Sequence, residues 1–418
     1  MAKDRWTLIV GAGAMQVPCV EAAHSLGLKV IVTDRNAAAP AVALADDFYA
    51  IDTYDHQRHR ELIRWLSDKK HRNIVGCFTA GADVAPTVAA CAEEARTPGI
   101  PFDVAQRTHN KLLVRHALTD EAITLEQPEY GSLYQEEWVE WGEDGIEQFT
   151  GVHYPMVIKP VEQCASRGLT LIHDQSELQS ALEKCWKYGE PALIEEGLTG
   201  SEHSAEIILD SQGQIIFFNV VDRVFLYDGG IALELGHINP SRLTTEQKIS
   251  IRKLLCASAK ALGVGWGPWK CDLMWTADGP KILEVTARLS GGWDSAATTP
   301  LSTGRNPIRV VCCLACNLPI IPEDLEGDKA RYSACAAAFP KPGLVTKIDI
   351  AKIKDLQRWM PQCEQIHLGI KLDDVIEAYE HNAQRRAFAI TTSSSYEEAW
   401  TLAEQAALVI EEAIMMEE

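Results

Sequence analysis

A strand, turn and strand pattern at residues 270–285 constrains the fold most, because it predicts an antiparallel hairpin. The central Thr-Ala-Asp-Gly-Pro favours a tight turn, and strand-forming residues flank it on both sides. In this hairpin Asp272 and Glu284 could face one side of the sheet, with Arg288 four residues beyond the second acid. Taken alone, such acids are more often solvated carboxylates on a sheet surface. Paired oxygen ligands beside a fixed cation also suit a magnesium-bound nucleotide triphosphate whose terminal phosphoryl group is transferred.

Length and charge narrow the class of protein. A chain of 418 residues with 46% hydrophobic content predicts two or three domains, each with its own core. The formal net charge of −20 disfavours a nucleic-acid partner, which needs clustered Lys and Arg. The sequence has no apolar run of the roughly 20 residues that cross a bilayer, and its first residues lead directly into a strand. We therefore expect a cytoplasmic protein with no membrane partner.

The 12 cysteines are expected to be reduced and mostly buried, because the chain is large and has no secretory signal. Cys312, Cys313 and Cys316 form the only tight group, with the spacing of a buried helix face. A zinc site is not expected there, since no second Cys or His pair follows at ligand spacing.

Residues 6–34 have the pattern of a β-α-β unit. Gly11 and Gly13 permit the turn of a dinucleotide fingerprint, and Asp34 ends the second strand where a ribose-binding acid would lie. The third fingerprint position is Gln16, where a small residue is needed for close packing of helix and strand. An NAD-binding oxidoreductase is therefore one alternative, and a scaffold without a cofactor is the other.

Further strands are expected at 47–51 and 73–79. The second opens into the loop 80–83, at the carboxyl end of a parallel strand, where small-molecule substrates commonly bind.

The middle of the chain places two lysines where an anion would meet them. Lys111 opens an amphipathic helix, and Lys159 ends an apolar strand, which is costly without an anionic partner. The loop 163–168 follows, and its Ser and Gly residues could offer backbone N–H groups to phosphate oxygens. By itself this loop is equally an ordinary hairpin turn.

The order of these segments resembles the ATP-grasp superfamily over essentially the whole chain. The matching features are Lys111, Lys159 in Ile-Lys-Pro, the Ser/Gly loop, the strand 192–198 with Glu202 after it, Asp272, and Glu284 with Arg288. The pattern is most similar to carboxylate–amine ligases that join L-amino acids. The resemblance implies an α/β and α+β multidomain fold: a Rossmann-like domain at 1–107, an ATP-grasp module at 108–318 with a lid at about 125–197, and a C-terminal α+β domain at 319–418.

The resemblance also implies ATP as substrate and Mg²⁺ as cofactor, with Mn²⁺ as an alternative metal. Arg288 would hold the acceptor carboxylate, and Asp272 and Glu284 would hold the metal. The nucleotide would be bound through phosphate contacts at Lys111, Lys159, Ser166 and Gly168, adenine contacts along Glu195, Glu196 and Leu198, and a ribose contact at Glu202. Many members have Asn two residues after the second acid, whereas this chain has Thr286, a weaker ligand, so one metal is better supported than two.

Substrate-binding residues are expected around Arg288. Glu234 could pair with a substrate ammonium and His237 could accept or orient a proton, by similarity to amino-acid ligases. Gly291 would let the backbone approach the substrate, and Trp293 could limit its size. The alternatives are a loop histidine bonded to backbone and a core tryptophan.

The C-terminal segment alternates strand and helix signals, with strands expected at 332–339 and 388–392, a turn at 342–343, and helices at 353–359 and 396–414. Its Trp359, His367 and His381 are interpreted as structural.

The sequence thus predicts an ATP-dependent ligase that joins a carboxylate to an amine, releasing ADP and phosphate. The partners expected are a small-molecule carboxylate and amine; the sequence leaves their identity open, and also leaves a homodimer open. A purine-biosynthesis or biotin-carboxylase-like enzyme that uses bicarbonate is the second enzymatic interpretation.

Overall fold

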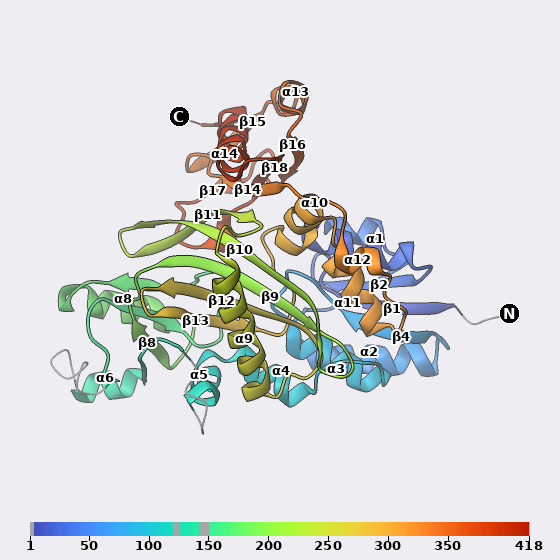
Figure 1. Cartoon of the computed structure of the whole chain (residues 1–418), viewed down its shortest axis with the longest axis horizontal. Coiled ribbons are helices and arrows are strands. Elements are labelled where there is room, and N and C mark those ends of the chain that lie inside the picture. The colour runs from blue at the N-terminus through green and yellow to red at the C-terminus, as the bar shows by residue number, and fades with distance from the viewer. Residues whose placement is uncertain (1–3, 120–125, 142–149, 418) are drawn as a thin grey trace.

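The computed structural model describes residues 4–119, 126–141 and 150–417. Parts of the predicted domains, including residue 125 and residues 142–149 of the lid, lie outside these ranges. Within the described ranges, no helix combines the length and apolar character needed to span a membrane. Figure 1 shows the N-terminal domain at one end, the lid at the other and a large sheet between them.

The N-terminal domain is a parallel four-stranded sheet of order β3-β2-β1-β4. Its strands are β1 (Arg5–Val10), β2 (Lys29–Asp34), β3 (Asp47–Ala50) and β4 (Asn73–Phe78). Its helices are α1 (Val17–Ser25), α2 (His56–Asp68), α3 (Ala85–Ala95) and α4 (Phe102–His109). The Rossmann-like pattern of the sequence is confirmed, because strand and helix alternate and neighbouring strands run parallel.

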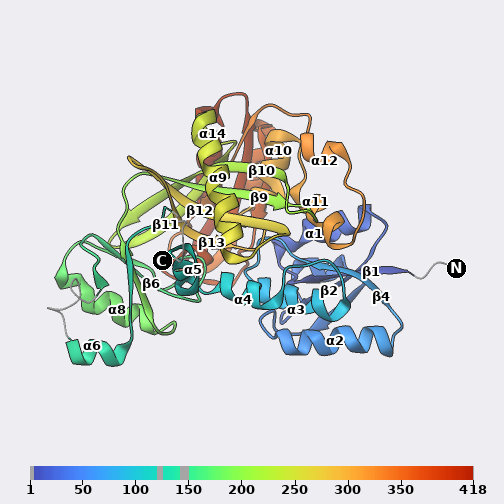
Figure 2. The ribbon, with the colours of Figure 1, turned by 60° about the horizontal axis from the view of Figure 1, so that its bottom comes forward.

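Both faces of this sheet are buried, which explains its continuous apolar strands. One face packs on α2 and α3 (Figure 2). The other packs on α1 and on α11 (Pro307–Ala315), a helix distant in sequence. Cys312 and Cys316 are fully buried in this contact, so the predicted helix face of cysteines is confirmed.

The lid is an antiparallel sheet of order β5-β8-β6-β7, packed on α8 (Leu178–Trp186). Its strands are β5 (Tyr130–Leu133), β6 (Met156–Pro160), β7 (Thr170–Ile172) and β8 (Ala192–Glu196). Two further helices are α5 (Lys111–Thr119), which precedes the lid and begins at Lys111 as predicted, and α6 (Gln135–Trp141).

An eight-stranded antiparallel sheet of order β13-β12-β9-β10-β11-β14-β18-β16 forms the centre. Its first five strands in sequence are β9 (Ser201–Leu209), β10 (Ile215–Asp228), β11 (Ile231–Asn239), β12 (Gly267–Thr276) and β13 (Gly279–Thr286). Helix α9 (Thr245–Leu262) covers one face and packs on the fully buried Trp269. The predicted hairpin is β12–β13, and Asp272 lies directly opposite Glu284.

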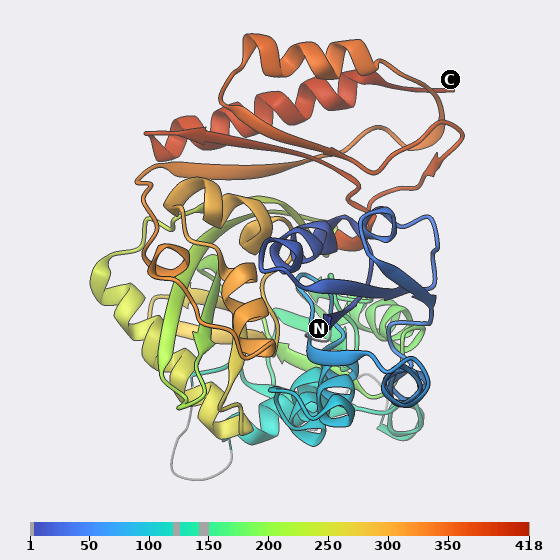
Figure 3. The same ribbon diagram turned by 90° about the vertical axis from the view of Figure 1, so that its right-hand side faces the viewer.

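The C-terminal segment continues the same sheet through β14 (Tyr332–Ala338), β18 (Ala387–Ser393) and β16 (Cys363–Leu368). It forms the orange and red layer at the top of Figure 3, with its long helices on the outer side. The remaining elements are β15 (Gly343–Ile348), β17 (Val375–Ile376), β19 (Ile414–Met416), α10 (Thr299–Thr303), α12 (Pro322–Glu326), α13 (Ile350–Trp359) and α14 (Tyr396–Ala413).

The predicted fold class is confirmed, with a parallel N-terminal sheet followed by antiparallel central and C-terminal sheets. The boundaries at 107 and 318 stay predictions. One local expectation was wrong, because Gly343 begins a strand instead of completing a turn. Of the two interpretations of His237, the loop histidine is excluded, since His237 lies in β11.

The joint between β11 and β14 depends on a glycine. A Cβ atom on Gly236 would lie 1.9 Å from the Cys335 carbonyl oxygen and 2.9 Å from the Trp400 ring. We expect Gly236→Ala to lower the free energy of unfolding by about 2–4 kcal/mol, because backbone must move. Urea unfolding of both proteins measures this. Gly265→Ala is the matched control, since nothing lies within 4 Å of its Cβ position; equal stability of the two variants would contradict the prediction.

Candidate functional site

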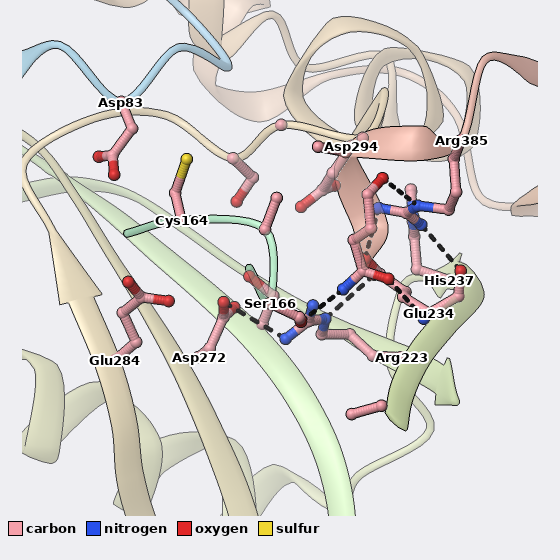
Figure 4. Close-up of a pocket in the computed structure, with 18 of the residues that line it drawn as sticks. Asp83, Cys164, Ser166, Arg223, Glu234, His237, Asp272, Glu284, Asp294 and Arg385 are labelled. Carbon is pink, nitrogen blue, oxygen red and sulfur yellow. Dashed lines mark hydrogen bonds and ion pairs between the residues drawn. The ribbon is translucent and has the colours of Figure 1, made fainter. Parts of the chain in front are cut away.

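A cavity of about 1050 Å³ lies where the N-terminal loops, the lid, the large sheet and the C-terminal segment meet. It is lined by every predicted site residue except Gly168. Gly168 has a φ of +71°, and a Cβ there would lie 2.7 Å from the Tyr188 ring. This glycine is therefore explained by the turn and by packing, and its position outside the lining does not favour the predicted phosphate contact. Figure 4 shows the acids Asp83, Asp272 and Glu284 on one side of the cavity, and Arg223 with Glu234 and Arg385 on the other.

The hairpin acids project into this cavity from neighbouring strands. Asp272 is 2.6 Å from the Lys270 ammonium and 3.3 Å from the Arg223 guanidinium. Burial alone would raise the pKa of Asp272, but Arg223 and Lys270 hold it below its ordinary value. Glu284 is 2.9 Å from the Lys111 ammonium. The Asp272 carboxylate is therefore available as an anion, and the Glu284 carboxylate is paired with a cation.

The donor set fits a divalent cation bound together with a ligand. Among the described residues, the Asp272 Oδ1 atom is buried without a hydrogen-bond partner. No cluster of three or more His, Cys, Asp or Glu side chains in those residues could hold a metal ion. Two carboxylates with the remaining positions filled by phosphate oxygens and water is the usual arrangement for Mg²⁺. The Thr286 hydroxyl donates to Asp83 at 3.2 Å, so it is already engaged.

The two predicted phosphate-binding lysines are held by carboxylates from separate strands. Lys159 is buried, and its ammonium lies 2.7 Å from Glu195. Burial, together with Arg115, lowers the pKa of Lys159 despite this pairing. Lys111 contacts Glu284, and its pKa is raised despite the burial that opposes this, through Glu284 and Asp83. Both ammonium groups line the cavity.

Arg115 is a buried cation whose position sequence reasoning missed. From α5 its Nε donates to Glu195 at 2.7 Å, and its Nη1 and Nη2 donate to the carbonyls of Ile282 and Leu283 at 3.0 and 2.7 Å. The Glu195 side chain thus pairs with both Arg115 and Lys159. The adenine contact predicted for this segment concerns the backbone edge of its strand. Glu196 is 3.2 Å from the Lys281 ammonium.

Arg223 on β10 connects three acids. It lies 3.0 Å from Glu234, 3.3 Å from Asp272 and 3.5 Å from Glu202. Burial, with Asp272 and Glu234 nearby, raises the pKa of Glu202, which also accepts a hydrogen bond from Tyr227. The ribose role predicted for Glu202 stays a prediction.

Glu234 is held on its other side by Arg385, at 2.9 Å. Burial opposes ionisation, but the two guanidinium groups hold the pKa of Glu234 well below its usual range. A carboxylate held this way is a weak base. The geometry therefore disfavours the predicted assistance with amine deprotonation, while an electrostatic contact with an ammonium stays open.

Arg288 faces the cavity beside an acid of the N-terminal domain. Its Nε is 3.5 Å from Asp83, and its Nη1 donates to the Leu289 carbonyl at 3.1 Å. Asp83 belongs to the loop after β4 that was expected to meet substrate. Gly291 lies against Gly81 of that loop, where a Cβ atom on Gly291 would be 3.4 Å from the Gly81 carbonyl oxygen. The two domains therefore pack closely at this point.

Trp293 forms an aromatic wall with a residue interpreted as structural. The ring centroids of Trp293 and His367 are 3.4 Å apart with an interplanar angle of 10°. Both residues line the cavity, so the structural interpretation of His367 was incomplete. Burial lowers the pKa of His367 to about 4, which keeps the imidazole neutral.

The N-terminal glycine loop does not favour a dinucleotide. The Gln16 side chain fills the space above it, since Cβ atoms on Gly11 and Gly13 would lie 3.3 and 3.1 Å from Gln16 atoms. Its Nε2 also donates to the Ala80 carbonyl at 2.5 Å. The Asp34 carboxylate accepts from the backbone N–H of Ala12 at 3.0 Å and is used within the loop. These contacts argue against the NAD-binding alternative.

The chain matches two family models. A PylC-like N-terminal domain matches residues 7–101, and an ATP-grasp domain matches residues 152–297, which run from the lid to Ala297. The chain therefore contains an ATP-grasp domain, and the predicted resemblance to that superfamily is confirmed.

Relatives of this ATP-grasp protein include D-alanine–D-alanine ligases. The one from Aromatoleum aromaticum is 30% identical over 151 residues, covering 35% of this chain and 48% of that protein. The one from Geobacillus thermodenitrificans is 30% identical over 174 residues, covering 40% and 47%. The chain thus spans about half the length of the curated relatives it matches.

Solved structures share the complete fold. The L-amino acid ligase from Bacillus licheniformis is 22% identical with a TM-score of 0.79, over 100% of both chains. The ATP complex of carboxyaminoimidazole ribonucleotide synthase from Aspergillus clavatus is 16% identical with a TM-score of 0.75, over 99% of this chain and 100% of that one. These likenesses establish the fold.

His237 of this ATP-grasp protein is buried, and its Nε2 lies 2.9 Å from the Thr298 hydroxyl. Burial lowers its pKa to about 4 in spite of Glu234. Since an unfolded His has a pKa of about 6.5, the neutral ring contributes up to about 3 kcal/mol of stability. This contribution is fully present above pH 6.5 and is lost as the pH falls through about 4.

We therefore expect the His237 imidazole to stay neutral between pH 5 and 8. Proton NMR of the ring measures this directly, with His237→Gln identifying the resonance. A midpoint near the unperturbed value of about 6.5 would contradict the burial argument.

Proposed function

We propose that this protein is an ATP-dependent carboxylate–amine ligase. It would activate the carboxylate of an amino acid as an acyl phosphate and join it to an amine, releasing ADP and phosphate. The observation that carries the proposal is one cavity lined both by groups that suit phosphoryl transfer and by a cation that suits a carboxylate. Lys111, Lys159 and the acid pair are the first set of groups, and Arg288 is the cation.

Residues of the chain would position the ATP phosphates and the acceptor carboxylate. Lys111 from α5 and Lys159 from the lid would contact the phosphates. Mg²⁺ held by Asp272 and Glu284 would neutralise charge on the phosphate oxygens. Arg288 holds the acceptor carboxylate so that one oxygen attacks the terminal phosphorus and ADP leaves.

The second step forms the amide. The amine nitrogen attacks the acyl carbon, phosphate leaves with the electrons of the carbon–oxygen bond, and the amine proton passes to water or phosphate. Glu234 would orient a substrate ammonium electrostatically, because its two arginine partners make it a poor proton acceptor. His237 is neutral and can accept or orient a hydrogen bond at the cavity wall.

Amino acids are the proposed substrates for two reasons. The D-alanine–D-alanine ligases and the L-amino acid ligase among the similar proteins are named for such substrates. The pocket also offers matching chemistry, with a guanidinium for a carboxylate, an acid for an ammonium, and the Trp293–His367 pair for an apolar side chain.

A product screen tests the proposal. The protein is incubated with Mg-ATP and pairs of amino acids and amines, phosphate release is followed, and product masses are measured. Phosphate release that needs both an amino acid and an amine, with an amide of matching mass, supports it. Phosphate release with bicarbonate as the only acceptor would support the carboxylating alternative instead.

Loss of one metal-binding charge tests the acid pair. Glu284→Gln should reduce turnover by at least about 100-fold, because a charged ligand at the phosphoryl site is removed while the side-chain size is kept. Steady-state ADP production measures this. Glu412→Gln is the control, since that acid pairs with Lys352 on the surface. Wild-type turnover in a folded Glu284→Gln variant would contradict the proposal that Glu284 holds the metal.

A second variant separates nucleotide binding from carboxylate positioning. Arg288→Lys keeps the charge but loses the planar two-pronged contact with a carboxylate. We expect Mg-ATP affinity to change little and amide formation to fall by about 100-fold, because a shift of about 1 Å in an attacking atom has that effect. Calorimetry of ATP binding and mass-detected amide formation measure the two. Equal loss of both would mean that Arg288 is structural.

A further inference from the structure

A short turn of the C-terminal segment, residues 382–385, touches both the lid loop and strand β11. Asn382 of this turn is buried, lines the cavity and forms hydrogen bonds in both directions. Neither Asn382 nor Arg385 carried any signal in the sequence that pointed to the site.

On one side Asn382 holds the loop that follows Lys159. Its backbone N–H donates to the Ala165 carbonyl at 3.0 Å, and its Nδ2 donates to the Ser166 hydroxyl at 2.9 Å. Ala165 and Ser166 have φ values of +57° and +60°. Two consecutive left-handed residues that are not glycine are unfavourable and persist only where the surroundings impose them. The bonds from Asn382 therefore help to hold a loop conformation that the loop itself does not prefer.

On the other side the same turn holds Glu234. The Glu234 backbone N–H donates to Asn382 Oδ1 at 2.8 Å, and Arg385 Nη1 donates to the Glu234 carbonyl at 2.9 Å. Strand β14 pairs with β11 only along residues 236–239, so Glu234 lies beyond the end of that pairing. The turn thus takes the place of the neighbouring strand at the position where Glu234 projects into the cavity.

We propose that Asn382 is a positioning residue that couples closure of the loop 164–168 to the placement of Glu234. This inference rests on the proposed function. One side chain ties the loop expected to cover the ATP phosphates to the strand expected to orient the second substrate. When the loop closes over ATP, Glu234 is then already in place to orient the second substrate.

The coupling protects the acyl phosphate. If the loop closes without a placed amine, water attacks the acyl carbon, phosphate leaves and the original carboxylate is regenerated, so ATP is consumed without amide. The ratio of amide formed to phosphate released therefore reports on the coupling, whereas a general loss of folded protein lowers both amounts equally.

The test compares Asn382→Ala and Asn382→Asp with the wild type. We expect Asn382→Ala to raise KM for ATP by about 10-fold, for the loss of two side-chain hydrogen bonds, and to lower the amide-to-phosphate ratio several-fold. Asn382→Asp keeps an acceptor for the Glu234 N–H and can accept a hydrogen bond from the Ser166 hydroxyl, so its amide-to-phosphate ratio should fall less than that of Asn382→Ala. Asn36→Ala is the control, because Asn36 is exposed and does not line the cavity.

A double-mutant cycle tests the contact itself. Ser166→Ala removes the loop partner, and the effects of Ser166→Ala and Asn382→Ala on ATP affinity should overlap and not add. Additive effects, or an unchanged amide-to-phosphate ratio in folded Asn382 variants, would overturn the coupling while leaving the ligase intact. Absence of amide from the wild type would instead count against the proposed function, so the two failures are distinguishable.

Discussion

The Arg115 guanidinium joins the lid to the large sheet at a fully buried position. It bonds to Glu195 of the lid and to two carbonyls of β13, while Glu195 also holds Lys159. Removing one partner of a buried ion pair costs about 3–5 kcal/mol, because the other charge is left without compensation. This interaction places Lys159 and the acid hairpin relative to each other, and the phosphoryl-transfer geometry depends on both.

The cavity is preassembled by charge pairing. Lys111 contacts Glu284, Lys159 contacts Glu195, and Lys270 with Arg223 contacts Asp272. In the proposed reaction Mg²⁺ would replace the lysines as the partner of the acids, and the ATP phosphate oxygens would replace the acids as the partners of the lysines. Each buried charge would therefore keep a partner of opposite sign. Before ATP binds, Glu284 raises the pKa of Lys111, whereas burial lowers the pKa of Lys159 in spite of Glu195.

The N-terminal domain contributes the Asp83 carboxylate to the cavity, and its glycine loop does not favour a dinucleotide. Gln16 fills the space above the glycine loop, and Asp34 is used to hold the backbone of that loop. The loop after β4 instead brings Asp83 to Arg288. The N-terminal sheet that contains the β-α-β unit thus also carries the acid that contacts Arg288 of the ATP-grasp module.

The sequence by itself determined the β-α-β unit, the hairpin that carries Asp272 and Glu284, the helix at Lys111, and the order of motifs that indicated the superfamily. These depend on local turn chemistry, strand patterns and spacing along the chain. Only the tertiary structure decided the roles of Arg223, Arg385 and Asn382, the partner of Arg288, and the stacking of His367 on Trp293. Arg385 lies 151 positions from Glu234, and Asn382 lies 216 from Ser166. Such pairs leave no periodic trace in the sequence, because a buried charge or amide finds its partner through the packing of whole segments.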